Sequence, residues 1–122
     1  MAGDWAAKTA AEIDCSFGQF MDDGQQTGEI SYLEGGRDHI DAGVFRVRPG
    51  EHPDRTPVPH VFDRDEYLWV IEGQVQVETT GTSTTLRAGD CAFFPSGHTG
   101  TWTFEAPFRK FSVEIARGGE EQ

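Results

Sequence analysis

His60 and Glu66 are the side chains whose types and spacing predict acid–base chemistry in this sequence. An imidazole changes its charge near neutral pH, and a carboxylate beside it can share the proton, so the two form a candidate acid–base couple. A carboxylate buried inside a barrel has its pKa raised by desolvation, or lowered if the imidazole is charged. The plainer alternative is that the two side chains hydrogen-bond each other or line a polar pocket.

The elements that must position this pair are short strands. Apolar and polar residues alternate over residues 74–78 and 110–115, which is typical of half-buried strands. Residues 67–71 are apolar throughout, which predicts a strand covered on both faces. Strands that recur about every ten residues, separated by Gly and Pro turns, indicate an all-β sandwich or barrel.

Two segments before His60 do not follow the strand pattern. Residues 5–13 predict a short helix, with Asp4 as its N-cap. Residues 49–59 hold Pro49, Pro53, Pro57 and Pro59, and proline lacks the N–H that an interior strand needs. We therefore expect a rigid extended loop that delivers His60 to the next strand.

Length and charge exclude several classes of protein. A chain of 122 residues has room for one domain. Its net charge of −11 argues against nucleic acid or an anionic membrane surface as a partner. The chain shows neither a signal peptide nor the roughly 20 apolar residues of a membrane span. Cys15 and Cys91 have no metal-type spacing and are expected to be free thiols, as in a cytoplasmic protein.

The segments around His60 and Pro95 resemble the two motifs of the cupin superfamily. Residues 60–66 read His-Val-Phe-Asp-Arg-Asp-Glu, and Gly73 follows seven residues after Glu66. Residues 89–97 read Gly-Asp-Cys-Ala-Phe-Phe-Pro-Ser-Gly, similar to the second motif, and the resemblance spans about residues 42–115. The stretch Gly-His-Thr-Gly-Thr-Trp at 97–102 and the late Arg109-Lys110 are similar to small cupins grouped with the ethanolamine-utilization Q protein and the ureidoglycine aminohydrolases.

This resemblance implies a double-stranded β-helix, the jelly-roll barrel of cupins. Residues 42–122 would form the barrel, and residues 1–41 would be a short N-terminal extension. It also implies a homodimer in which an N-terminal strand of each subunit packs on the other. Of the net charge, −7 lies before residue 42, so the low pI is poor evidence about a ligand of the barrel.

In metal-binding cupins three His and one Glu or Gln hold a divalent metal. His60 and Glu66 match two of these positions, whereas the other two are Phe62 and Gly100. His98 stands two residues before Gly100 and would share its strand face, giving a His60, Glu66 and His98 set. A metal site of these three residues and a metal-free pocket are both open.

Three further side chains are candidates for contact with a small-molecule ligand. Phe62 and Trp102 could line the pocket and stack on a ligand, or belong to the core. Lys110 could reach the lumen and bind an anion, or point at solvent.

The sequence therefore predicts a small cupin that binds a small polar metabolite in its lumen. Catalysis by His60 and Glu66 would be isomerisation or hydrolysis rather than oxygenation, because the ligands usual for iron are incomplete. The alternative is a non-catalytic ligand-binding or accessory cupin, and a purely structural role is a third reading.

Overall fold

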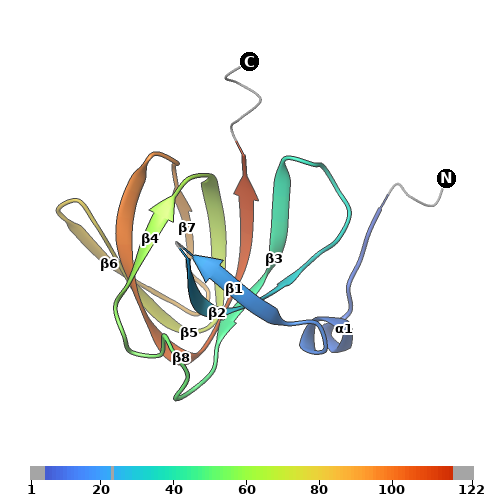
Figure 1. Ribbon diagram of the computed structural model, residues 1–122, viewed down its shortest axis with the longest axis horizontal. Helices are drawn as coiled ribbons and strands as arrows, with labels where there is room; N and C mark the ends of the chain where they lie inside the picture. Colours follow the sequence, from blue (N-terminus) through green and yellow to red (C-terminus); the bar gives the residue numbers. More distant parts are fainter. Residues whose placement is uncertain (1–4, 23, 117–122) are drawn as a thin grey trace.

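The computed structural model describes residues 5–22 and 24–116 of the chain. Within these residues, one short helix precedes eight strands that curl into a barrel (Figure 1). The elements are α1 (Ala10–Asp14), β1 (Gly18–Asp22), β2 (Gln25–Tyr32), β3 (Ile40–Val47), β4 (Val58–Phe62), β5 (Asp65–Thr79), β6 (Thr82–Arg87), β7 (Cys91–Phe94) and β8 (His98–Ile115). The all-β jelly-roll prediction is confirmed.

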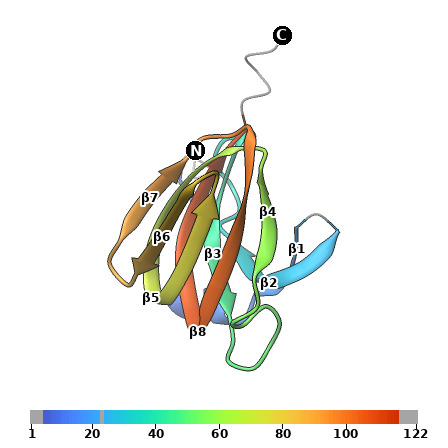
Figure 2. The ribbon, with the colours of Figure 1, turned by 90° about the vertical axis from the view of Figure 1, so that its left-hand side faces the viewer.

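Two long strands, β5 and β8, pair along most of their length and hold the barrel together. One half of the barrel has the order β1-β2-β3-β8-β5, with β7 paired to the first part of β5. In the other half, β4 pairs with the first part of β8, and β6 pairs with the second part of β5 (Figure 2). All of these pairings are antiparallel, so inward side chains alternate with outward ones along every strand.

Over residues 110–115, the polar face of β8 points into the barrel and the more apolar face points outward. Phe108, Lys110 and Ser112 are buried, whereas Phe111 is 36% exposed on the outside. The prediction that residues 67–71 are covered on both faces is also wrong, because Tyr67 and Trp69 are each about half exposed. Tyr67 and Trp69 of β5 and Phe111 of β8 lie on the outer face, whereas Lys110 and Ser112 point into the barrel.

The N-terminal segment joins the barrel sheet. Residues 29–32 of β2 pair with residues 43–46 of β3, and β1 pairs with β2 of its own chain. The helix begins later than predicted, at Ala10, because Thr9 and Glu12 form a capping box there. Asp4, the predicted cap, lies outside the described residues. The homodimer stays a prediction.

The proline-rich segment ends earlier than expected. β4 includes Pro59 and His60, and Pro59 is tolerated because β4 pairs with β8 alone.

No helix among the described residues is long and apolar enough to cross a membrane.

Gly73 lies where β5 bends from one half of the barrel to the other. Its φ is +78°, and the register of β5 against β8 shifts on both sides of Glu72. A Cβ at this position would lie 2.3 Å from the carbonyl oxygen of Pro107 and 2.9 Å from that of Glu105. Both obstacles are backbone atoms of the partner strand, so the close approach requires glycine.

We expect Gly73→Ala to lower the free energy of unfolding by about 2 kcal/mol or more, because left-handed strain adds to the backbone clash. The matched control is Gly81→Ala, with φ +70° and open space around the Cβ, which should cost only about 1 kcal/mol. Urea unfolding measures both. Equal losses in the two variants would contradict the close approach of β5 and β8 at Gly73.

Candidate functional site

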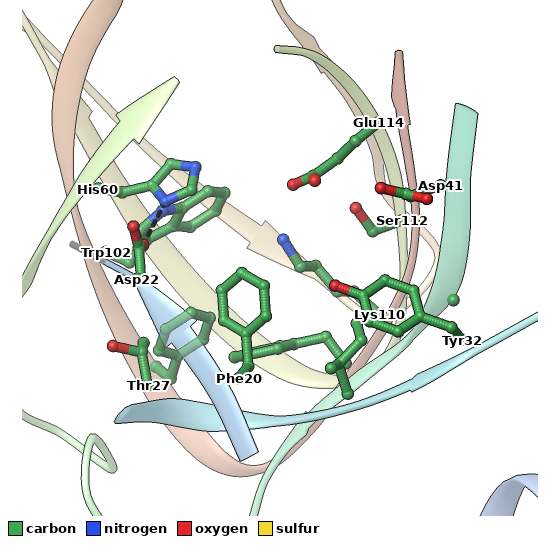
Figure 3. A pocket seen from close by; sticks show the side chains of 14 residues that line it. Phe20, Asp22, Thr27, Tyr32, Asp41, His60, Trp102, Lys110, Ser112 and Glu114 are labelled. Atoms are coloured by element: carbon green, nitrogen blue, oxygen red, sulfur yellow. Dashed lines mark hydrogen bonds and ion pairs between the residues drawn. The ribbon is translucent and has the colours of Figure 1, made fainter. Parts of the chain in front are cut away.

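The barrel has a narrow cavity of about 30 Å³ that opens to solvent. Rings form much of its wall, namely Phe20, Tyr32, Phe45, Trp102 and Phe104. Its polar lining consists of Asp22, Thr27, Asp41, His60, Lys110, Ser112 and Glu114 (Figure 3). A more polar outer hollow shares several of these residues and adds Asp63 and Arg64. The lumen is therefore an aromatic chamber with a charged mouth.

His60 is held in the cavity wall by a carboxylate from the N-terminal hairpin. Its Nδ1 lies 2.6 Å from Oδ2 of Asp22, and both side chains are about nine-tenths buried. Because a carboxylate accepts hydrogen bonds, Nδ1 carries the proton and donates it to Asp22. The edge of the Phe62 ring and the indole of Trp102 pack against the imidazole, with centroids 4.4 and 5.1 Å away. The orientation of His60 is thus fixed from two sides.

Glu66 lies beneath His60 in a buried ion pair. Its Oε2 accepts hydrogen bonds from Nζ of Lys110 at 2.6 Å and from Oγ of Ser112 at 2.7 Å. The ammonium also lies 4.5 Å from the centroid of the Trp102 ring. Oε1 is buried without a hydrogen-bond partner among the described residues and lies 3.8 Å from Nε2 of His60.

Two opposing effects set the ionisation of Glu66. Burial raises the pKa of this carboxyl, but the Lys110 ammonium and the hydrogen bonds from Lys110 and Ser112 outweigh it. The pKa of Glu66 therefore lies below its ordinary value, and the carboxylate stays ionised at neutral pH.

The pKa of Glu114 shifts in the opposite direction to that of Glu66. Burial, and then the charge of Glu66, raise its pKa. Its carboxylate extends from β8 toward the wall that holds His60 (Figure 3).

The predicted ligand-contact residues divide into two groups. Trp102 and Lys110 line the cavity. Phe62 belongs to the core, where its ring stacks on Phe94 with centroids 5.0 Å apart. Lys110 does reach the lumen, but its charge is committed to Glu66 rather than available to an anion.

The residues at the metal positions of cupins do not fit a metal here. A Cβ at Gly100 would lie 3.2 Å from the Phe62 ring and 2.7 Å from the carbonyl oxygen of Glu78, so Phe62 fills the space beside the lost ligand positions. His98 packs on that ring, with centroids 5.0 Å apart. Across residues 5–22 and 24–116, no three His, Cys, Asp or Glu side chains are placed to hold a metal ion together. The predicted His60, Glu66 and His98 set therefore does not assemble, and an ammonium already neutralises Glu66.

Most of the lining residues escaped the sequence reasoning, and four of them show what signal the sequence held. Ser112 and Glu114 carried a signal, because they alternate with Lys110 and must share its strand face. Asp22 is brought to His60 by the β1–β2 hairpin, which the Asp23-Gly24 pair could have indicated. Tyr32 carried no comparable signal.

Comparison with known proteins places this geometry in a family. The model of the EutQ-like cupin domain matches residues 35–111. The chain belongs to the EutQ-like cupin family. No curated protein matches it. The resemblance drawn from the motifs around His60 and Pro95 is confirmed.

Solved structures agree on the fold. A Salmonella typhimurium LT2 protein assigned as ethanolamine utilization protein Q matches with a TM-score of 0.65 and 24% identity, covering 81% of this cupin and 77% of that chain. A Rhizobium leguminosarum protein of unknown function matches with a TM-score of 0.64 and 22% identity, covering 93% and 99%. The iron(II) form of HppE has a TM-score of 0.66 and 13% identity, covering 92% and 61%. At these identities the likeness shows the cupin fold alone.

We expect Lys110→Met to lower the free energy of unfolding at neutral pH by about 3–5 kcal/mol, because it leaves a buried carboxylate without its cation. In the wild type the pKa of Glu66 is depressed below 4.5, so its contribution is full above that pH and is lost as pH falls through the lower folded value. In the variant burial, the largest cause, is opposed only by the Ser112 hydrogen bond and by His60, so we expect the pKa of Glu66 to rise and stability to fall as pH rises.

Urea unfolding between about pH 4 and pH 7 measures this reversal. The matched control is the double variant Glu66→Gln with Lys110→Met, which removes both charges and should recover most of the loss. A Lys110→Met variant that keeps the pH dependence of the wild type would show that Lys110 does not compensate Glu66.

Proposed function

We propose that the lumen of this cupin binds a small polar metabolite and that His60 exchanges a proton with it. The observation that carries the proposal is the 2.6 Å contact between Nδ1 of His60 and Asp22 in the wall of the cavity. A carboxylate that fixes the tautomer and orientation of an imidazole is a recurring support for a general base.

The contacts of His60 assign its two nitrogens different roles. Nδ1 is occupied by Asp22, so the second nitrogen is the one free to exchange a proton. Nε2 lies 3.8 Å from Oε1 of Glu66, too far for a hydrogen bond, which fits an unprotonated Nε2 that acts as the base. When Nε2 takes up a proton, the charge that forms lies between Asp22 and Glu66, and both carboxylates stabilise it.

The roles of the predicted couple therefore differ. Glu66 stays ionised through Lys110 and Ser112, so it supports charge on His60 rather than carrying the proton itself. Trp102 and the other rings form the wall against which the apolar part of a ligand packs. Isomerisation and hydrolysis both begin with a proton removed from carbon or from water, and a single positioned base suits either reaction.

Binding can be tested with Trp102 as a reporter inside the lumen. Trp5 and Trp69 are 76% and 50% exposed, so replacing both by Phe leaves Trp102 as the single tryptophan without disturbing the core. We expect members of a panel of small carboxylates, amides, amines and sugar derivatives to change its emission and to raise the thermal midpoint. If no class does either, the lumen does not bind small metabolites.

His60→Gln tests the catalytic half with whichever panel member binds. The glutamine side chain keeps a hydrogen-bond donor for Asp22 but cannot act as a base, so the variant should bind while turnover falls by roughly 100-fold or more. His98→Gln, which removes an imidazole outside the cavity lining, is the matched control and should leave turnover unchanged. Binding by the wild type without turnover of any bound compound would favour the alternative, a non-catalytic ligand-binding cupin.

A further inference from the structure

An apolar patch covers the outer face of the barrel where β5 lies between β7 and β8. Each strand contributes two side chains to this outer patch, namely Tyr67, Trp69, Cys91, Phe93, Phe111 and Val113. In the register of the sheet, Tyr67 lies between Phe93 and Val113, and Trp69 occupies the middle of the next row. The rings of Tyr67 and Phe93 have centroids 4.7 Å apart. The six side chains therefore form one contiguous surface.

The outer patch is exposed and carries no charge. Tyr67, Trp69 and Phe93 are each about half exposed, and Phe111 is 36% exposed. The patch borders a hollow of about 390 Å³, and none of the eight residues that line this hollow is charged. A quarter of the whole chain is charged, so the patch differs from the rest of the surface. Contiguous exposed apolar surface of this kind marks an interaction site.

The N-terminal segment covers only the neighbouring part of the same face. Oγ of Ser16 lies 2.7 Å from Oγ of Ser31 on β2, and the guanidinium of Arg46 on β3 lies 3.9 Å from the centroid of the Phe17 ring. Phe111 lines both the groove beside this segment and the hollow of the outer patch, so it marks the boundary between them. Among the described residues, no segment covers the exposed rings beyond this boundary.

The size of the outer patch suits an interface between two proteins. At about 200 Å² for an aromatic side chain, the exposed parts of its four rings amount to roughly 350–400 Å². An interface of standard size takes about 800 Å² from each partner, a little over half of it apolar. The four rings alone therefore supply most of the apolar area that a stable dimer needs from each copy.

Charge and symmetry favour a second copy of the chain as the occupant. Two copies with a net charge of −11 each repel one another, and the repulsion is weakest where the facing surfaces carry no charge. A two-fold axis brings the patch against itself, so apolar surface meets apolar surface. The ion pair between Glu72 and Arg109, at 3.9 Å, lies on the same two strands and supplies a polar rim.

We propose that the outer patch is the interface of a homodimer, in which two copies pack their patches face to face across a two-fold axis. The rings of each copy enter the hollow of the other, as side chains interdigitate between packed sheets, and Cys91 becomes buried. This dimer differs from the expected exchange of N-terminal strands, since β1 pairs with β2 of its own chain. It is independent of the proposed function, because none of the patch residues lines the lumen.

Trp69→Arg tests the interface by analytical ultracentrifugation. We expect the wild type to sediment as a dimer and the variant to have a dissociation constant raised at least about 100-fold, because a two-fold interface receives each unpaired charge twice. Trp69 is half exposed and lies outside the core, so the variant should fold, which urea unfolding checks. The matched control is Trp5→Arg, at a more exposed tryptophan, and Met21→Arg on β1 reports on the N-terminal strands. Both should leave the dimer unchanged.

The two native cysteines give a second measurement that needs no substitution. Cys91 and Cys15 are both exposed in the single chain, and only Cys91 belongs to the outer patch. Iodoacetamide in excess, followed by mass spectrometry of the peptides, gives the alkylation rate of each thiol. We expect the rate at Cys91 to fall at least about ten-fold as the protein concentration rises through the dissociation constant, while the rate at Cys15 stays constant.

Three outcomes would overturn the proposal. The first is a wild type that stays monomeric up to about 100 µM, because interfaces of standard size bind in the micromolar range or more tightly. The second is a dimer that Met21→Arg dissociates and Trp69→Arg does not, which would favour exchange of the N-terminal strands. The third is protection of Cys15 without protection of Cys91, which would place the interface on another face.

Discussion

The buried ion pair between Lys110 and Glu66 is the constraint around which the lumen is organised. Both side chains are more than nine-tenths buried, and withdrawing two charges from water costs several kcal/mol each. Their 2.6 Å contact, the hydroxyl of Ser112 and the ring face of Trp102 offset that cost together. Because Glu66 belongs to β5 and Lys110 to β8, this compensation depends on the long pairing that closes the barrel.

The same pair explains why the lost metal-ligand positions of the cupin motif do not leave a defect. Where a cupin metal would neutralise the motif carboxylate, the chain supplies an ammonium of its own at Lys110. Phe62 occupies the space beside Gly100 and packs on Phe94 and Trp102, so the volume is filled as well as the charge. The two substitutions are complementary, since aromatic faces stabilise the buried cation and the cation keeps Glu66 ionised.

The fold and half of the candidate site could be predicted from the sequence, for a physical reason. His60 and Glu66 come from motif segments whose turns and spacing dictate a local arrangement, and the structure places their nearest polar atoms 3.8 Å apart. Alternation along residues 110–115 revealed two faces but not which one points inward, because apolar residues also cover the outer face at Phe111. The sequence could indicate the hairpin that carries Asp22 but not its contact with His60, since that contact spans 38 residues and depends on how the hairpin folds over the barrel.

The two walls of the lumen carry different charged groups, and the N-terminal segment supplies one group of the wall that holds His60. On one wall Asp22 of β1 holds His60 of β4, so the orientation of His60 depends on a strand from outside the motif region. On the other wall Glu114 is held only by a long ion pair with Arg64, at 3.8 Å, while Lys110 is hydrogen-bonded to Glu66. Because Lys110 is paired with Glu66 and Arg64 with Asp41, the two walls differ in the polar groups that they present to the cavity.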